Sequence, residues 1–175
     1  MSKRNAKATA SAVVYRKPQL ADAAAIHALI DACKPLDLNS VYAYLLLCEH
    51  FSETCVVAEH EGRVAGFLSA YLKPADPTTM FVWQVAVGES VRGHGVGRAL
   101  LAELLARPGA AGADRLETTI TPSNAPSWAL FRSFARRIGA GCEDRALFHD
   151  HQFGGEGHEE ERLLQISPLR SGQGR

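Results

Sequence analysis

A glycine-rich run at residues 92–97 constrains the fold of this chain more than any other feature. The run follows an apolar, strand-like stretch at residues 81–87 and precedes a helix-like stretch at residues 98–106. A strand, a glycine turn and a helix in this order point several backbone N–H groups and the positive end of a helix at one place. The run therefore predicts a binding site for a phosphorylated ligand.

The spacing of the run excludes two common nucleotide loops. It matches neither G-x-G-x-x-G nor G-x-x-x-x-G-K-[ST], because no Lys-Ser or Lys-Thr pair follows Gly97. Read as R-x-x-G-x-G, with Arg92, Gly95 and Gly97 as its fixed letters, it resembles the acyl-CoA loop of the GNAT acetyltransferase superfamily. The alternative is a turn that only joins the strand to the helix. The resemblance implies that these residues bind acetyl-CoA: Arg92, Gly93, His94, Gly95, Val96, Gly97 and Arg98.

The composition of the chain indicates a single globular domain. Its 175 residues include 19 Lys and Arg, 19 Asp and Glu, and 46% hydrophobic residues, which is enough for a substantial core. Without an excess of positive charge there is no electrostatic case for nucleic acid or an anionic membrane, and no segment is long enough to span one. We therefore expect a soluble, cytoplasmic protein with one domain at residues 13–167, between disordered tails at 1–12 and 168–175.

Neither the cysteines nor the histidines are spaced as a metal site. No C-x-x-C pair occurs, and three of the cysteines lie in apolar periodic segments, where we expect small buried hydrophobic residues rather than disulfide partners. The four cysteines are Cys33, Cys48, Cys55 and Cys142. His149 and His151 could bind zinc together, but no further pair with the spacing of a structural site completes the set. We therefore expect no metal, and we interpret residues 149–159 as a glycine-bearing loop that closes over the substrate.

Hydrophobic periodicity predicts two helices before the sheet. The first starts at Asp22, and the second starts at Asn39 or Ser40, either of which is a good N-cap. The predicted buried faces are Ile26, Leu29, Ile30 and Cys33 in the first helix, and Val41, Tyr44, Leu45 and Cys48 in the second.

Runs rich in β-forming residues alternate with further helical segments. Strands are expected at 13–16, 55–59, 64–71, 81–87, 115–120 and 162–166, with a hairpin turn at 61–62, a loop at 73–79 and a helix within 125–138. This order predicts an α/β (α+β) fold with helices on both faces of the sheet. The GNAT resemblance implies a mixed, mostly antiparallel central sheet.

Two further segments strengthen the resemblance. Residues 85–87 look like the central GNAT strand, and residues 123–131 look like the start of the later helix, N-x-x-A/S-x-x-L-[FY]. In that superfamily the backbone of the central strand binds the pantetheine arm and the thioester carbonyl, roles that would fall to Val87 and Val85 here. Asn124 would contact the pantetheine or the thiol end, or cap the helix, and the two roles are compatible.

A more specific resemblance is carried by segments in both the first half of the chain and its C-terminal part. Four segments resemble the L-2,4-diaminobutyrate acetyltransferases, which catalyse the acetylation step of ectoine biosynthesis: residues 35–48, 81–85, 116–124 and 158–161. The resemblance covers most of residues 13–167. It implies acetyl transfer from acetyl-CoA to the γ-amine of the diamino acid. It also implies that the protein is a homodimer and that the reaction serves osmoprotection.

Candidate substrate residues follow from the charges of a diamino acid. Its two ammonium groups require acidic side chains, and a carboxylate on an interior strand is favoured only when it is paired. Glu117 and Thr119 share one face of a predicted strand because side chains alternate. The alternative for Glu117 is an internal salt bridge to Arg115 or another arginine.

Residues near the second helix are further candidates. Asp37 and Asn39 lie just before it, where helix capping is the alternative role. Tyr42 and Trp83 present aromatic faces that attract an ammonium group by ~0.5–2 kcal/mol. For Trp83 the alternative is packing in the core.

The simplest chemistry is direct attack of a neutral amine on the thioester, because no Cys or Ser lies in a nucleophile–base pattern. Glu117 and His158 are the leading candidates for the base, followed by Glu159, and the Val85 N–H would hold the oxyanion. Phe131, a cofactor residue by resemblance, stands where many GNAT enzymes have a tyrosine that protonates the leaving thiolate, so the general acid is elsewhere or absent. The alternatives are a GNAT enzyme for another amine, such as a polyamine, an aminoglycoside or a protein N-terminus, and a non-catalytic acyl-CoA-binding module.

Overall fold

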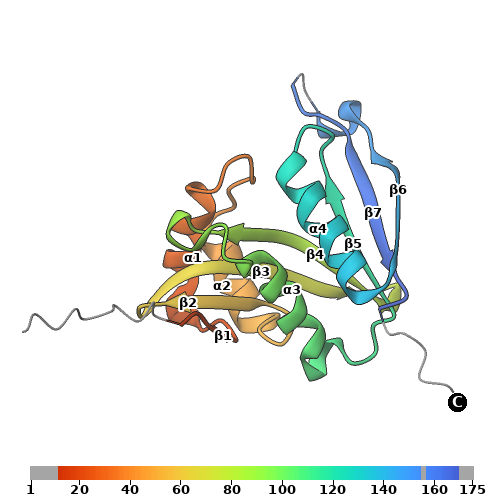
Figure 1. The fold of residues 1–175 in the computed structure, drawn as a ribbon. Coiled ribbons are helices and arrows are strands. Elements are labelled where there is room, and N and C mark those ends of the chain that lie inside the picture. The colour runs from red at the N-terminus through yellow and green to blue at the C-terminus, as the bar shows by residue number, and fades with distance from the viewer. Residues whose placement is uncertain (1–11, 155–156, 170–175) are drawn as a thin grey trace, which may run out of the picture.

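The computed structural model of the protein describes residues 12–154 and 157–169. Within them, seven strands form one sheet in the order β1-β2-β3-β4-β5-β7-β6 (Figure 1). Every neighbouring pair is antiparallel except β4 and β5, which run parallel. The expectation of a mixed, mostly antiparallel sheet is confirmed. The strands are β1 (Val14–Arg16), β2 (Val56–His60), β3 (Arg63–Lys73), β4 (Asp76–Val87), β5 (Arg115–Ile120), β6 (Gly141–Phe148) and β7 (Glu161–Ser167).

Helices cover both faces of the sheet, as the sequence predicts (Figure 1). The first two helices enclose one buried apolar cluster with the sheet, and the last two enclose another on the opposite face. The helices are α1 (Ala23–Asp31), α2 (Val41–His50), α3 (Val96–Ala106) and α4 (Ala125–Ile138). Short 3₁₀ turns lie at Leu20–Asp22, Glu89–Val91, Pro108–Ala110 and Asp150–Phe153.

Helix α2 starts where the sequence predicts but buries a different face. Its N-cap is Ser40, whose Oγ accepts a hydrogen bond from the Ala43 N–H at 3.3 Å. Val41 and Leu45, which the periodicity placed inside, are 40% and 36% exposed. The helix is apolar on nearly all sides, so periodicity alone does not select the face that packs. The buried residues are Tyr44, Leu47 and Cys48.

A β-bulge in β4 changes which side chains face each cluster. The register between β3 and β4 shifts between Ser69 and Ala70, which leaves Trp83 as the extra residue. Before the bulge, Val82 packs in the cluster under α3 and α4, whereas Ala86 after it packs in the cluster under α1 and α2. The alternation of β4 is therefore inverted at Trp83.

The two parallel strands, β4 and β5, separate next to the bulge at Trp83. β4 and β5 pair only from Thr79 with Arg115 to Val82 with Thr118. Beyond these residues β4 stays paired with β3, and β5 stays paired with β7. The sheet consequently opens between its two halves, as Figure 1 shows.

Two boundaries in the sheet differ from the sequence-based expectations. The loop expected at 73–79 is only a turn at Pro74 and Ala75, because β4 already begins at Asp76. Strand β6 was not predicted at all. Most of its residues are exposed at the edge of the sheet, and its middle is the charged run Glu143, Asp144 and Arg145, so it carries no apolar alternation.

The C-terminal boundary of the domain also lies further along than expected. Leu169, which falls in the expected tail, packs against the core, and its N–H donates a hydrogen bond to the Asp114 carbonyl at 2.8 Å. The packed domain thus includes residues 168–169. The rest of the two expected tails, residues 1–11 and 170–175, lies outside the described residues.

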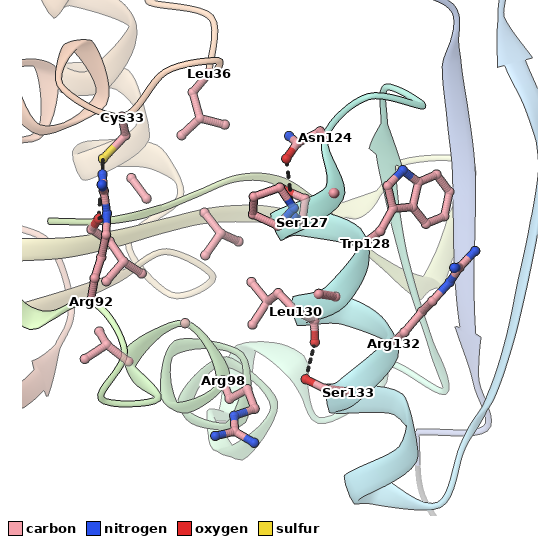
Figure 2. A pocket seen from close by; sticks show the side chains of 18 of the residues that line it. Cys33, Leu36, Arg92, Arg98, Asn124, Ser127, Trp128, Leu130, Arg132 and Ser133 are labelled. Carbon is pink, nitrogen blue, oxygen red and sulfur yellow. Dashed lines mark hydrogen bonds between the residues drawn. The ribbon is translucent and has the colours of Figure 1, made fainter. Parts of the chain in front are cut away.

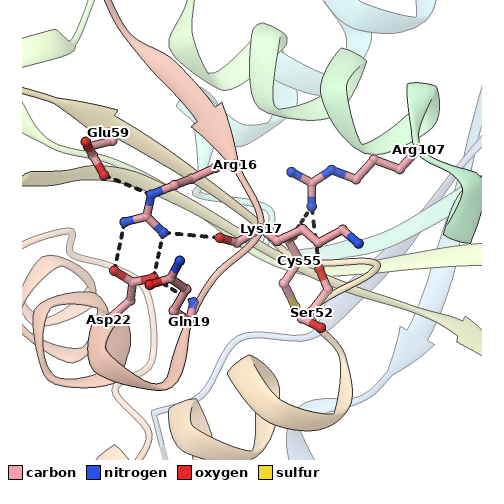
Figure 3. Close-up of polar contacts among 8 residues, drawn as sticks. All are labelled: Arg16, Lys17, Gln19, Asp22, Ser52, Cys55, Glu59 and Arg107. Atoms are coloured by element: carbon pink, nitrogen blue, oxygen red, sulfur yellow. Dashed lines mark hydrogen bonds and ion pairs between the residues drawn. The ribbon is translucent and has the colours of Figure 1, made fainter. Parts of the chain in front are cut away.

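Charged side chains tie the first strand and the end of α3 to their neighbours (Figure 3). Arg16 donates hydrogen bonds to Asp22 at 2.7 and 2.9 Å and to Glu59 at 2.8 Å. The hydrogen bonds from Arg16 hold the pKa of the Asp22 carboxyl below its usual value. Arg107, just after α3, donates to the backbone oxygen of Cys55.

All four cysteines are free thiols, and three of them are buried as predicted. Burial raises the pKa of Cys48 to about 11 and that of Cys55 to about 12, so both stay protonated at neutral pH. Cys142, which lies outside the predicted apolar segments, is exposed because it lies on the edge strand β6. In the described part of the chain, no cluster of three or more His, Cys, Asp or Glu is arranged to hold a metal, and none of its helices is both long and apolar enough to cross a membrane.

Candidate active site

A cleft of about 1120 Å³ lies where β4 and β5 separate (Figure 2). Its walls come from the end of β4, the glycine run with the start of α3, the side of α4, and the segment after α1. Most of the expected cofactor residues line it: Val85, Val87, Arg92, Gly93, Gly95, Val96, Gly97, Arg98 and Asn124. Of the others, His94 is exposed outside the lining, and Phe131 is 3% exposed within the core under α3 and α4.

The glycine run forms the N-terminus of α3 with free backbone donors. Gly95 is the N-cap with a φ of +76°, a left-handed conformation that favours glycine. The first helical hydrogen bond runs from the Ala99 N–H to the Gly95 carbonyl. The N–H groups of residues 96–98 have no acceptor among the described residues, and all three residues line the cleft. This is the donor arrangement that binds phosphate at a helix N-terminus.

Gly97 sets how closely α3 approaches α4. A Cβ at Gly97 would lie 3.2 Å from Cδ1 of Leu130, which is tighter than ordinary van der Waals contact. The glycine therefore lets the start of α3 pack directly on the middle of α4.

Arg92 crosses the cleft wall and is held at its base. Its Nε donates to the Val87 carbonyl at 2.9 Å, and its Nη2 lies 3.7 Å from Sγ of Cys33 (Figure 2). Cys33 also donates to the Val87 carbonyl at 3.6 Å. Because that carbonyl already accepts two hydrogen bonds, Val87 would offer its N–H rather than its oxygen to a ligand.

The start of α4 forms the opposite wall. Asn124 is the N-cap, and its side chain accepts a hydrogen bond from the Ser127 N–H at 3.2 Å. The capping role anticipated for Asn124 is confirmed, and the residue also lines the cleft. Trp128 donates from Nε1 to the Thr121 carbonyl at 3.0 Å, which fixes the helix to the end of β5.

The cleft is electropositive although the chain has no net charge. Its cationic lining residues are Lys34, Arg92, Arg98, Arg132 and Arg136. No Asp or Glu belongs to the lining that the structure describes. A ligand with several negative charges is therefore favoured here.

An acidic cluster lies at the open end of β5 and β7. Glu161, the first residue of β7, hydrogen-bonds the side chain of Thr119 and interacts with the charges of His158 and Asp37. Burial is the main cause that raises the pKa of Glu161 above its usual value. Asp37 directly follows Leu36, a residue of the cleft lining, so the cluster adjoins the cleft.

Glu161 is a member of this acidic cluster that is not among the candidates chosen from the sequence. The signal was present, since side chains alternate along a strand and place Glu161 on the face of Leu163, opposite the buried Leu164. The expected strand started one residue too late, at Arg162, and therefore left Glu161 in the preceding loop.

The loop before α2 is fixed by a buried hydrogen-bond network. Gln84 donates from Nε2 to the Asp37 carbonyl, and the hydroxyl of Tyr44 accepts from the Asn39 N–H. Because Ser40 is the N-cap, neither Asp37 nor Asn39 is needed for capping.

The two aromatic candidates are not core residues. Tyr42 is 68% exposed and Trp83 is 45% exposed, so packing in the core does not account for either. Tyr42 projects from the first turn of α2, and Trp83 is the bulged residue of β4. Both side chains are free to contact a ligand or another protein surface.

Comparison with known proteins identifies the family of the chain. The model of the acetyltransferase (GNAT) family matches residues 23–135. The chain belongs to the GNAT acetyltransferase family. L-2,4-diaminobutyric acid acetyltransferases from Bordetella parapertussis and Halomonas elongata are 50% and 47% identical to it, over 91% and 94% of this chain and 88% and 85% of theirs. The solved structure of a diaminobutyrate acetyltransferase from Paenibacillus lautus, in complex with L-2,4-diaminobutyric acid and coenzyme A, is 39% identical with a TM-score of 0.88, covering 94% of this chain and 99% of that chain.

In this GNAT protein, Glu117 lies at the paired end of β5. Its carboxylate accepts a hydrogen bond from Lys73 Nζ at 2.8 Å, and its side chain is only 8% exposed. It is in register with Phe81. The β3 partners of Phe81 and Val85 are Tyr71 and Leu68, three residues apart, so at about 3.3 Å per residue ~10 Å separate the two levels. The ion pair is the alternative that the sequence allowed, with a lysine in place of an arginine.

The segment before β7 is tied to the start of α4 in this GNAT protein. The Glu159 carboxylate accepts hydrogen bonds from the N–H and the hydroxyl of Ser123. The ring of His158 stacks on Phe153 with centroids 3.8 Å apart, and its Nδ1 lies 2.7 Å from the Glu159 backbone oxygen. The Glu159 carboxylate is thus engaged by Ser123, and the charges of both Glu159 and His158 act on Glu161.

Proposed function

We propose that this protein transfers the acetyl group of acetyl-CoA to the γ-amine of L-2,4-diaminobutyrate, giving N4-acetyl-2,4-diaminobutyrate for ectoine biosynthesis. One observation carries the proposal: an electropositive cleft with unpaired helix N-terminal donors adjoins an acidic cluster around the half-buried Glu161. The first fits the phosphates of a coenzyme, and the second fits a substrate with two ammonium groups. The similarity to relatives named for this reaction supports the same substrate.

The cofactor in this proposal is acetyl-CoA, held without a metal. The N–H groups of Val96, Gly97 and Arg98 receive its diphosphate, together with the glycine turn and the Arg98 side chain. The N–H groups of Val85 and Val87 hold the pantetheine arm and the thioester carbonyl, and Asn124 contacts the same arm. The coenzyme supplies an activated acyl group as a thioester.

We assign the base to Glu161 in place of Glu117. An amine with a pKa near ~10 must lose a proton before it attacks, which at neutral pH corresponds to roughly 3–4 kcal/mol. Burial raises the pKa of Glu161 toward that of a better proton acceptor, and His158 interacts with its carboxylate. Glu117 is not assigned as the base, because its charge is paired with Lys73 and it does not line the cleft.

The reaction then proceeds by direct attack of the neutral amine on the thioester. The Val85 N–H stabilises the oxyanion, an interaction of a class worth about 2.7–4 kcal/mol. Phe131 lies in the core and supplies no proton to the leaving thiolate. A thiol with a pKa near ~8.5 is an adequate leaving group without full protonation.

The amine substrate is bound by residues around the acidic cluster. Asp37 and Glu161 face the two ammonium groups, and Thr119 and Asn39 supply hydrogen bonds. Tyr42 and Trp83 contact an ammonium group through their ring faces. Glu159 takes part by holding the His158 segment against Ser123.

A second copy of this chain is the proposed macromolecular partner, and the cytoplasm is the proposed compartment. α2 and the loop before it expose several apolar side chains, which a homodimer interface would cover: Leu38, Val41, Tyr42 and Leu45. Acetyl-CoA, a multiply phosphorylated thioester, is an intracellular co-substrate. Sedimentation velocity of the full chain tests the dimer, and a single monomer peak at micromolar concentration would contradict it.

The decisive experiment is identification of the product. The purified protein is incubated with acetyl-CoA and L-2,4-diaminobutyrate, thiol release is followed, and the product is analysed by mass spectrometry and NMR. Acetylation at N4 is expected. A panel of polyamines, aminoglycosides and N-terminal peptides is run in parallel. A tenfold higher kcat/KM for any of these, or cofactor binding without thiol release, would refute the proposal.

A further inference from the structure

We infer that Arg136 on α4 binds the 3′-phosphate of the coenzyme ribose and makes the cleft selective for CoA over its 3′-dephospho form. The inference rests on acetyl-CoA being the cofactor, as proposed above. It concerns the nucleotide end of the cleft, where none of the acyl-transfer residues lie. Arg136 is an exposed residue of the cleft lining, two residues before the end of α4.

The residues of helix α4 indicate where each part of the coenzyme would lie along the cleft. Gly97 packs on Leu130, so the diphosphate donors at the start of α3 face the middle of α4. Asn124 at the acyl end lies six residues before Leu130, and Arg136 lies six residues after it. At a rise of 1.5 Å per residue, each interval is about 9 Å. A coenzyme that extends from Asn124 past the diphosphate donors therefore directs its nucleotide toward Arg136.

The cleft face of α4 continues to Arg136. Pro126, Ala129, Ser133 and Arg136 all line the cleft, at intervals of three, four and three residues. That spacing keeps them on one side of the helix. Figure 2 shows Ser133 on the same side of α4 as Arg98 of α3, which marks the end of the cleft opposite Asn124.

Other cations of the cleft already have partners. Arg92 donates to the Val87 carbonyl, and Lys34 pairs with Asp31 at 3.0 Å. Arg132 stacks over the Trp128 ring at 4.7 Å and lies 3.6 Å from Asp144. Figure 2 shows the Arg132 side chain directed toward the strands and away from Arg98.

Two cations of the cleft, Arg98 and Arg136, remain for the diphosphate and the 3′-phosphate of the coenzyme. Arg98 lies beside the diphosphate donors, with its Nη2 3.5 Å from the position of a Cβ on Gly95. The Arg136 carbonyl accepts from the Gly139 N–H, but its guanidinium has no hydrogen bond or ion pair among residues 12–154 and 157–169. A phosphate monoester carries close to two negative charges at neutral pH and accepts a bidentate guanidinium. Arg136 is thus placed and free to bind the 3′-phosphate.

The test compares acetyl-CoA with acetyl-3′-dephospho-CoA by calorimetry and by KM. The wild-type protein is expected to bind the dephospho form about tenfold more weakly. In Arg136→Ala, the affinity for acetyl-CoA should fall about tenfold, while the affinity for the dephospho form and the kcat at saturation stay unchanged. The loss of affinity caused by removing the phosphate and the loss caused by removing the guanidinium should therefore not be additive.

The matched control is Arg137→Ala, which removes the same charge one residue later, outside the cleft lining. It should bind both cofactors as the wild type does. Equal weakening of both cofactors in Arg136→Ala, or the same loss in Arg137→Ala, would overturn the inference. Because binding is measured without an amine, this outcome is distinct from failure of the proposed function, which would show as normal cofactor binding without acetylation of diaminobutyrate.

Discussion

The side chain of Gln84 donates a hydrogen bond to the Asp37 carbonyl at 2.7 Å and so joins the central strand to the loop beside the acidic cluster. Gln84 is 4% exposed, and its Oε1 accepts from the buried Tyr44 hydroxyl at 3.3 Å. The same hydroxyl accepts from the Asn39 N–H at 3.4 Å. Residues of the core thereby determine where the loop of Asp37 and Asn39, the proposed substrate loop, lies.

We expect Gln84→Leu to raise the KM for diaminobutyrate several-fold while the Kd for acetyl-CoA stays unchanged. The substitution leaves the Asp37 carbonyl and the Tyr44 hydroxyl without their partner, which costs about 1–3 kcal/mol of stability. Steady-state kinetics and urea unfolding measure the two effects. Gln165→Leu, at a half-buried glutamine of β7, is the control for stability loss alone. An unchanged amine KM in Gln84→Leu would show that the network does not position the loop.

Gly95→Glu is expected to abolish acetyl-CoA binding. Gly95 has a φ of +76°, and a carboxylate beside the free N–H groups of α3 would compete with the diphosphate. The control is Gly62→Glu, at a glycine with a similar φ of +71° in the β2–β3 turn. Calorimetry should detect normal cofactor affinity in the control and none in Gly95→Glu. Equal affinities in the two variants would mean that the helix N-terminus does not bind the diphosphate.

Glu161→Gln is expected to lower kcat at least ~10²-fold with little change in cofactor affinity, because it removes the proposed proton acceptor. Burial raises the pKa of Glu161, so the carboxylate form is lost as the pH falls through that raised value. The wild-type rate should therefore decline on the acid side at a pH above the usual glutamate pKa, and this limb should disappear in the variant. Glu160→Gln removes a neighbouring carboxylate that pairs with Arg162 and should keep the wild-type profile. A retained acid limb in Glu161→Gln would assign it to another group.

Glu117→Gln is expected to keep turnover within a few-fold of the wild type and to lower stability instead. The carboxylate is 8% exposed and pairs with Lys73 at 2.8 Å, so its loss leaves the ammonium group of a 38% exposed lysine without its partner. Unfolding of both single variants and of the double variant with Lys73→Met gives the coupling between the two residues. A fall in kcat of ~10²-fold, without change in stability, would return Glu117 to the mechanism.

Much of the fold and the cofactor site could be predicted because their signals are local. A left-handed turn before a helix requires a glycine such as Gly95, and a helix N-cap favours residues such as Asn124. The apolar strands and helices around them follow from short-range periodicity. The edge strand β6 could not be found this way, because its polar residues carry no such period.

Asp37 and Thr119 are candidates from the sequence, but how the proposed amine end is assembled could not be predicted, because it depends on contacts between distant segments. Asp37, Thr119 and Glu161 come from three different parts of the chain, and only folding brings them within electrostatic reach. Glu117 has the same residue type and the same strand setting as a site carboxylate. What distinguishes it is Lys73, 44 residues away in sequence.

The sequence by itself determined that a strand, a glycine turn and a helix create a candidate phosphate site, since backbone conformation and free N–H groups depend on neighbouring residues only. The tertiary structure alone decided where that site opens and what chemistry adjoins it. The bulge at Trp83 reverses which side chains of β4 face each apolar cluster, and it lies just where the pairing of β4 with β5 ends at Val82. A strand register and the burial of a carboxylate such as Glu161 are set by the packing of the whole domain, because hydrogen-bond partners and solvent exclusion come from residues far apart in the chain.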